Sequence, residues 1–283
     1  MKAMIKGELK GATYFVELTN TDGILYVDPG IVQTVINNLG DTFQDLTSGG
    51  ISTEEKPRFP HSDTGFSREP DSYAPLVHLL NRIILASRQF IPSSSPLSNL
   101  RFHSFGFEMI DLYDSQKGLK PDCVGITCEL PMDEKMETPK LSWEAVEVHV
   151  ECKNSESGMV VQSGTYARCC LTSYQRRSFS LGIGFHYKKL EVYILVFHRS
   201  GVSTSGPLEV TSPNGFNNLV NHIVGMLCIT DEAAYGLDTT RFQDTFRIND
   251  RYYKIIRQLY VRKHLRGRST IVHRLQGTYR CGF

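Results

Sequence analysis

The chain has 283 residues, 40% hydrophobic and 22% charged, a composition that is typical of a folded globular protein and unlike disordered or fibrous chains. No run approaches the roughly 18 apolar residues of a membrane span, and no apolar core follows the first charged residues, so no secretory signal is expected. The seven cysteines include no CxxC pair, which argues against a zinc site or a disulfide framework and favours an intracellular protein of the nucleus or cytoplasm.

We expect residues 1–68 to form an N-terminal arm and a linker. Within the arm, four apolar residues have helical spacing and Gly40 is a plausible stop: Val32, Val35, Ile36 and Leu39. The stretch from Ser48 to Glu69 is rich in Gly, Ser, Pro and charge, which indicates a long loop.

A strong amphipathic helix is expected from Asp71 to Phe90. Its apolar stripe consists of Leu76, Leu79, Leu80, Ile83 and Ile84. Pro75 fits the first turn, where its missing N–H costs little.

The remaining pattern alternates strands and helices. Strands are expected over 101–113, 122–128, 143–153, 179–185, 190–198, 252–262 and 269–275, with a polar hairpin over 130–141. Helices are expected over 160–174 and 213–227. This order predicts an α/β fold in which helices flank a mixed sheet.

The most informative strings are Pro121-Asp122 and Glu151-Cys152-Lys153. Glu151 and Lys153 share one strand face because successive strand residues point to opposite sides. If the Asp122 strand is a neighbour, both carboxylates can reach one point, as a Mg²⁺ or Mn²⁺ site requires. A lysine beside such a cation would assist metal-dependent phosphodiester hydrolysis.

The alternative is an ordinary solvated strand face. Glu-x-Lys strings are common, and this chain has further copies at Glu8 and at Glu54. Only the copy at Glu151 ends a convincing strand. Gln162 and Tyr166 lie one turn apart on the next helix and could face the site, or could be ordinary helix surface.

Charge is distributed unevenly along the chain. Residues 241–283 carry eleven Lys and Arg against two Asp, whereas the whole chain has a net charge of only +1. An excess of this kind can mark a surface that binds nucleic acid, or one that packs against an acidic protein surface.

A set of ordered strings resembles the region that precedes the kinase in fungal-type protein kinases. They include Glu69 to Leu76, Lys120-Pro121-Asp122, Glu151-Cys152-Lys153, Tyr174 to Phe179, His198 to Ser205, Tyr235 to Asp238 and Leu265 to Thr270. That region in turn resembles the PD-(D/E)xK nuclease fold. No Val-Ala-Ile-Lys, His-Arg-Asp or Asp-Phe-Gly string is present, so we expect the kinase itself to be absent.

The resemblance implies roles and boundaries. Metal ligands would be Asp122, Glu151 and Glu69, the catalytic residues Lys153 and Gln162, and the nucleic-acid contacts Arg176, Arg177, Arg266 and Arg268. It implies an arm over 1–68, a restriction-endonuclease-like domain over 69–240, and a basic extension over 241–283 that begins a truncated kinase-like lobe.

Three functions follow as hypotheses. The first is a Mg²⁺- or Mn²⁺-dependent nuclease, acting on DNA. The second is an inactive nuclease-like module that binds a protein partner or regulates a kinase domain. The third is a nucleic-acid-binding domain without cleavage, supported by the basic C-terminal segment.

Overall fold

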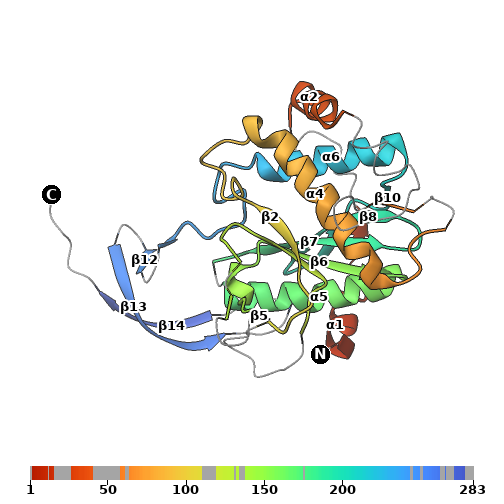
Figure 1. The fold of residues 1–283 in the computed structure, drawn as a ribbon. Coiled ribbons are helices and arrows are strands. Elements are labelled where there is room, and N and C mark those ends of the chain that lie inside the picture. Colours follow the sequence, from red (N-terminus) through yellow and green to blue (C-terminus); the bar gives the residue numbers. More distant parts are fainter. Residues whose placement is uncertain are drawn as a thin grey trace.

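The computed structural model describes residues 2–11, 13–15, 27–40, 58–60, 64–109, 119–130, 132–133, 138–174, 176–242, 245–248, 251–261, 265 and 271–277. Their main feature is an eight-stranded mixed sheet (Figure 1). Its order is β1 (Thr13–Phe15), β9 (Gly201–Thr204), β8 (Glu191–His198), β7 (Phe179–His186), β6 (Val148–Lys153), β3 (Cys123–Ile126) and β2 (Arg101–Ser104), with β10 (Leu208–Glu209) also paired to β8.

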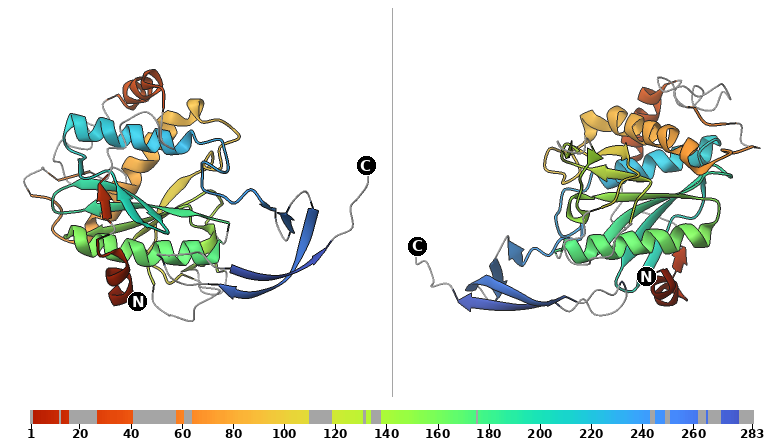
Figure 2. Two further views of the ribbon diagram at one scale, coloured as in Figure 1. Left: turned by 180° about the vertical axis from the view of Figure 1, so that it is seen from behind. Right: turned by 60° about the horizontal axis from the view of Figure 1, so that its bottom comes forward.

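Helices cover both faces of this sheet, which confirms the predicted α/β class (Figures 1 and 2). One face carries α2 (Pro29–Leu39), α4 (Tyr73–Ser87) and α6 (Pro213–Leu227). The other carries α5 (Glu156–Ser173) and α1 (Lys2–Leu9). Short 3-10 turns flank the helices and strands: η1 (Glu69–Ser72), η2 (Arg88–Phe90) and η3 (Trp143–Ala145).

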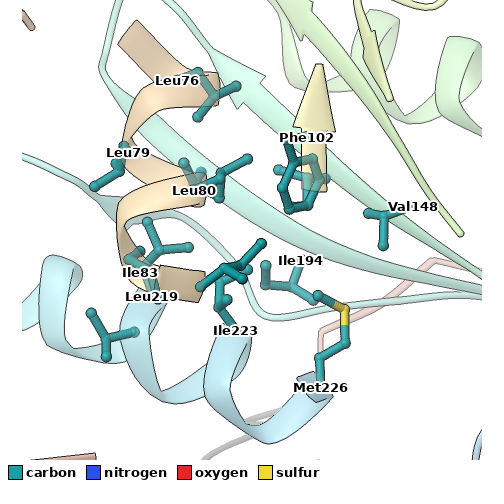
Figure 3. Packing of buried hydrophobic residues seen from close by; sticks show 14 of the residues in the cluster. Leu76, Leu79, Leu80, Ile83, Phe102, Val148, Ile194, Leu219, Ile223 and Met226 are labelled. Atoms are coloured by element: carbon teal, nitrogen blue, oxygen red, sulfur yellow. The ribbon is translucent and has the colours of Figure 1, made fainter. Parts of the chain in front are cut away.

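The larger core lies between the sheet and the α4–α6 layer. Figure 3 shows Leu76, Leu80 and Ile83 of α4 facing Leu219 and Ile223 of α6. These side chains are fully or almost fully buried. Each Å² of apolar surface removed from water contributes roughly 25 cal/mol, so this packing stabilises the core.

Local signals explain the helix boundaries. In α2, the Asp28 side chain accepts a hydrogen bond from the N–H of Gly30, and Pro29 occupies the first turn. Gly40 then ends the helix with a positive φ of 50°, a conformation that glycine adopts without steric strain. The structure thus confirms the predicted arm helix, and α2 packs on α4 and α6 within the main core.

The predicted strand over 143–153 is wrong in its first half. Residues Trp143–Ala145 form η3, because Trp143 stacks on Tyr166 of α5 with ring centroids 5.2 Å apart. The strand begins at Val148, and the face that we expected to be solvated lies under α5. His149 is 0% exposed and Glu151 only 1%.

Smaller β elements complete the fold. A two-stranded pair joins β4 (Met132–Asp133) to β5 (Thr138–Pro139), at the predicted polar hairpin. A separate four-stranded antiparallel sheet contains β11 (Arg241–Phe242), β12 (Thr245–Ile248), β13 (Arg251–Val261) and β14 (Ile271–Gly277). This sheet projects from the main body in the views of Figures 1 and 2. Among the described residues, no helix has the length and apolar character to cross a membrane.

Candidate functional site

Four charged side chains from three separate segments meet where β3 begins and β6 ends, inside the main sheet and not at one of its edge strands. We call Glu69, Asp122, Glu151 and Lys153 the acidic–lysine cluster. Glu69 begins η1, Asp122 directly precedes β3, and Glu151 and Lys153 end β6. Because β3 runs antiparallel to β6 with Cys123 opposite Val150, the register brings Asp122 to the level of Glu151. The structure therefore brings together the residues predicted from the Pro-Asp and Glu-x-Lys strings.

The ammonium of Lys153 lies among the three carboxylates. Its Nζ is 2.7 Å from Glu151 Oε1, 3.0 Å from Glu69 Oε1 and 4.0 Å from Asp122 Oδ2. It also donates to the carbonyl of Cys152 at 3.1 Å. An ammonium has three N–H donors, which Glu151, Glu69 and Cys152 account for. Asp122 is therefore held near the lysine by charge and not by a direct hydrogen bond.

Asp122 is fixed by two other donors. The backbone N–H of Cys152 donates to Oδ2 at 2.7 Å, and the hydroxyl of Tyr73 donates to Oδ1 at 2.7 Å. Burial is the largest effect on Asp122 and raises its pKa, while these hydrogen bonds and Lys153 oppose the shift. Each carboxylate oxygen still has a lone pair free for a further ligand.

Sequence analysis did not identify Tyr73 as a site residue. Its hydroxyl is also 3.1 Å from Glu69 Oε1, so it lies between the two carboxylates. Burial and the neighbouring carboxylate of Asp122 raise its pKa far above the ordinary value, which keeps the hydroxyl protonated as a donor. The four-residue spacing from Glu69, which places both side chains on one helical face, was the available signal.

Glu151 has the most unusual environment in the cluster. Its Oε1 contacts Lys153. Its buried Oε2 accepts no hydrogen bond among the described residues, because the nearby hydroxyl of Tyr166 donates to the carbonyl of Lys120 instead. Burial, followed by the charge of Asp122, raises the pKa of Glu151 to about 8, against the opposing effect of Lys153. An unsatisfied buried carboxylate oxygen is unfavourable unless a proton or a cation accompanies it.

Two side chains of α5 lie behind Glu151. Tyr166 donates to the carbonyl of Lys120 at 2.8 Å, and its pKa is raised strongly by burial and by the charge of Glu151. Gln162 interacts with Tyr166, and its buried Oε1 has no partner among the described residues. Gln162 therefore faces the interior beside the cluster and is not ordinary helix surface.

The donor set suits a hard divalent cation, since such ions prefer carboxylate oxygens. Within the described ranges, however, no three His, Cys, Asp or Glu side chains form a group that could hold a metal ion directly. The Lys153 ammonium occupies the space between the carboxylates instead. A cation held by Asp122 and by Oε2 of Glu151 would place a second positive charge close to the ammonium on Oε1.

The arginines predicted to contact nucleic acid lie elsewhere. Arg177 is buried and pairs with Glu147, which also accepts a hydrogen bond from Tyr235 at 2.5 Å. Arg176 pairs with Glu232 at 3.0 Å. The Arg176 pair holds the loop before β7 to the segment after α6, whereas the Arg177 pair holds it to the residue directly before β6. The burial of Arg177 disfavours a nucleic-acid contact there. Arg266 and Arg268 lie outside the described residues.

Comparison with protein families gives one match, to the model described as fungal protein kinase, over residues 122–280. No curated protein and no solved structure matches the chain. The match points to a kinase-like function, so the prediction of a metal-dependent nuclease is wrong, and the PD-(D/E)xK resemblance has no support. The family match does not confirm the expectation that the kinase itself is absent. Because the match covers more than half of the sequence, the chain belongs to the fungal protein kinase family.

Proposed function

We propose that this chain takes part in protein phosphorylation and that the acidic–lysine cluster binds a divalent cation together with the phosphates of a nucleotide. The family match supports a phosphoryl-transfer role. The single observation that carries the assignment to this cluster is Glu151, a buried carboxylate with one oxygen on Lys153 and the other without a partner in the described structure.

Each side chain has a role in this proposal. Asp122 and Glu151 would hold Mg²⁺ or Mn²⁺, and the cation would neutralise phosphate charge when bound. Lys153 would turn its ammonium toward a phosphate oxygen. Glu69 would keep the lysine near the site through their ion pair, in the way that a carboxylate from a helix positions the ATP-binding lysine of protein kinases.

The charge balance favours such a ligand. Three carboxylates surround one ammonium, so the ionised cluster carries an excess of negative charge in a partly buried place. Burial makes that excess unfavourable, and the raised pKa values of Glu151 and Asp122 are its consequence. A divalent cation removes the excess, and a nucleotide phosphate then gives Lys153 a new anionic partner.

Calorimetric titration with Mn²⁺–ATP tests the proposal directly. Wild-type protein should bind Mn²⁺–ATP, and either Asp122→Asn or Glu151→Gln should weaken binding by about tenfold or more, since each removes a charged ligand. Asp71→Asn is the matched control. Asp71 is a partly exposed carboxylate of η1, the turn that also carries Glu69, and among the described residues it pairs only with Arg68 and Ser67.

The same variants are then assayed for transfer of labelled γ-phosphate to protein. Loss of transfer in Asp122→Asn and Glu151→Gln, with retention in Asp71→Asn, would support a phosphorylation role. Equal binding of Mn²⁺–ATP by all four proteins would contradict the proposed site. The finer prediction of a restriction-endonuclease-like sheet stays a prediction about topology, and we attach no activity to it.

A further inference from the structure

The four-stranded sheet β11–β14 is the part of the molecule that the proposed function leaves unexplained. It projects away from the main sheet and its helices (Figures 1 and 2). Its strands contain no acidic residue, and all five of their Lys and Arg side chains that the structure describes are exposed: Arg247, Arg251, Lys254, Arg257 and Arg274. The basic excess noted in the sequence is thus concentrated on an extended element.

Strand register places most of this charge on one face. On β14, Val272, Arg274 and Gln276 alternate on the same side. Their partners directly across on β13 are Tyr260, Arg257 and Lys254, which therefore share that side. Tyr252 lies two residues before Lys254 in a regular stretch, and Arg247 of β12 is opposite Tyr252.

Two irregularities in β13 produce this arrangement. The register shifts between Ile255 and Arg257 and again between Gln258 and Tyr260. In a regular strand, residues three apart point to opposite faces, so Lys254 and Arg257 would be separated. Each bulge adds one residue and returns the next side chain to the same face. We call Arg247, Tyr252, Lys254, Arg257, Tyr260 and Arg274 the basic sheet face.

The chemistry of this face fits a polyanion that has aromatic groups. Arg257 and Arg274 are directly opposite each other, and like charges in that position repel unless an anion lies between them. Tyr252 and Tyr260 are 55% and 52% exposed and flank the cations. Exposed aromatic rings along a basic groove or sheet bind single-stranded nucleic acid, because the bases stack on the rings while the cations contact phosphates.

We propose that the basic sheet face binds single-stranded nucleic acid without strong sequence preference. Charge complementarity alone would also suit an acidic protein surface. The two exposed tyrosines on the same face as the cations favour the nucleic acid, since an acidic peptide has no bases to stack on them. The proposal is independent of the acidic–lysine cluster, which lies on the main sheet.

Fluorescence anisotropy of the full chain with labelled oligo(dT) of about 20 nucleotides tests this, since single-strand-binding modules cover roughly 4–16 nucleotides. The triple variant Lys254→Ala, Arg257→Ala, Arg274→Ala should reduce the magnitude of the slope of log affinity against log salt by about 2. Each lost phosphate contact reduces that slope by roughly 0.7. The pair Tyr252→Ala, Tyr260→Ala should weaken binding by at least about tenfold at constant salt, through lost stacking.

Two controls separate this face from charge in general and from the cluster. Arg251→Ala removes an exposed cation from the opposite face of the same strand and should leave affinity within about twofold of wild type, and Asp122→Asn should bind oligo(dT) normally. Far-ultraviolet circular dichroism and thermal melts check that each variant is folded. If the triple variant unfolds, the double tyrosine variant, which keeps all the charges, still tests the proposal.

Three results would overturn the proposal. The first is no binding by the wild-type chain at low salt. The second is weakening by Arg251→Ala as large as the weakening by the triple variant. The third is polyglutamate binding as tight as oligo(dT) binding, with neither affected by loss of the tyrosines, which would identify a surface for acidic protein instead.

Discussion

Glu151 shows how a strand can appear solvated in sequence and yet be buried. The alternation of Glu147, His149, Glu151 and Lys153 with valines is the ordinary pattern of a half-exposed strand. In the structure, α5 covers that side, so His149 and Glu151 are interior residues. The convergence of Asp122, Glu151 and Lys153 could be predicted from spacing, but their burial and the part played by Tyr73 depend on helix packing that local patterns do not encode.

The raised pKa of Glu151 predicts a characteristic dependence of stability on pH. Its folded pKa of about 8 exceeds the ordinary 4.5, so the folded protein binds the extra proton between these values. The stabilisation that this proton supplies is complete below about pH 4.5 and is lost as pH rises through 8. Within that window each pH unit should lower the contribution of this group by about 1.4 kcal/mol.

Thermal melts of metal-free protein between about pH 4 and 9 measure this effect, since that range brackets the ordinary and the raised pKa of Glu151. Glu151→Gln is a neutral isostere that cannot ionise, so its stability should fall less than that of wild type over the same range. Parallel pH profiles of the two proteins would contradict the shifted pKa.

Lys153 supports a second prediction at this scale. Its ammonium pairs with Glu151 Oε1, so it would repel a cation bound to the same carboxylate. Lys153→Met leaves the carboxylates without their internal counter-charge, which should destabilise the metal-free protein by about 3–5 kcal/mol, as removal of one partner of a buried pair does. Added Mn²⁺ should then raise the melting temperature of this variant more than that of wild type.

The matched control is Lys188→Met, an exposed lysine whose Nζ is 3.3 Å from the carbonyl of Ser67. Mn²⁺ should shift its melting temperature by the same amount as in wild type. A smaller Mn²⁺ shift in Lys153→Met than in wild type would show that the carboxylates do not hold the cation.

At the scale of elements, helices were the best predicted part of the fold. The stripe from Leu76 to Ile84 and the residues of α6 give clear helical periodicity, and α6 spans the predicted Pro213–Leu227. The short strands β1 and β9 were not predicted, because three or four residues are too few to show a period and their pairing joins segments far apart in the sequence. The register of β6 beside β7 likewise depends on contacts that no local pattern contains.

A close approach between β6 and β7 gives an element-scale prediction. Gly182 is opposite His149, and a Cβ at this glycine would lie 2.5 Å from the ring Nε2. The ring is fully buried and contacts Tyr166 and Phe197, so it has little freedom to move. Gly182→Ala should therefore lower the free energy of unfolding by about 1–3 kcal/mol, measured by urea denaturation.

Gly7 provides the opposite case for comparison. It lies within α1, where a Cβ would meet nothing within 4 Å. Gly7→Ala should leave stability unchanged or raise it by up to about 1 kcal/mol, because alanine favours the helix. Equal effects of the two substitutions would mean that the 182–149 contact does not restrict packing.

At the scale of the whole molecule, the basic excess of the C-terminal segment was evident in the sequence, but the position of most of this charge on one face depends on two bulges in β13. The contacts that attach this sheet to the main domain could not be predicted from the sequence either. Leu265, in the connection between β13 and β14, is fully buried against Ile5 and Leu9. Its backbone N–H donates to Glu8 of α1 at 2.9 Å. At the other end, Asp238 donates its N–H to the carbonyl of Arg176 at 2.8 Å.

Leu265 should therefore act as the anchor of the projecting sheet. Leu265→Ala removes a buried side chain that would typically contribute about 2–5 kcal/mol, and this loss should weaken the attachment more than the main core. Limited trypsin digestion should cleave the Arg- and Lys-rich segment over 241–283 several times faster in the variant, because local opening exposes its backbone.

The melting temperature of the main domain should change less than the cleavage rate, since the larger core, between the sheet and the α4–α6 layer, does not include Leu265. Ile256→Ala is the control, because that side chain is 48% exposed on the same sheet and should not alter the cleavage rate. If Leu265→Ala is cut no faster than wild type, the segment at Asp238 that precedes β11 holds the sheet to the main domain, and the buried leucine is not its anchor.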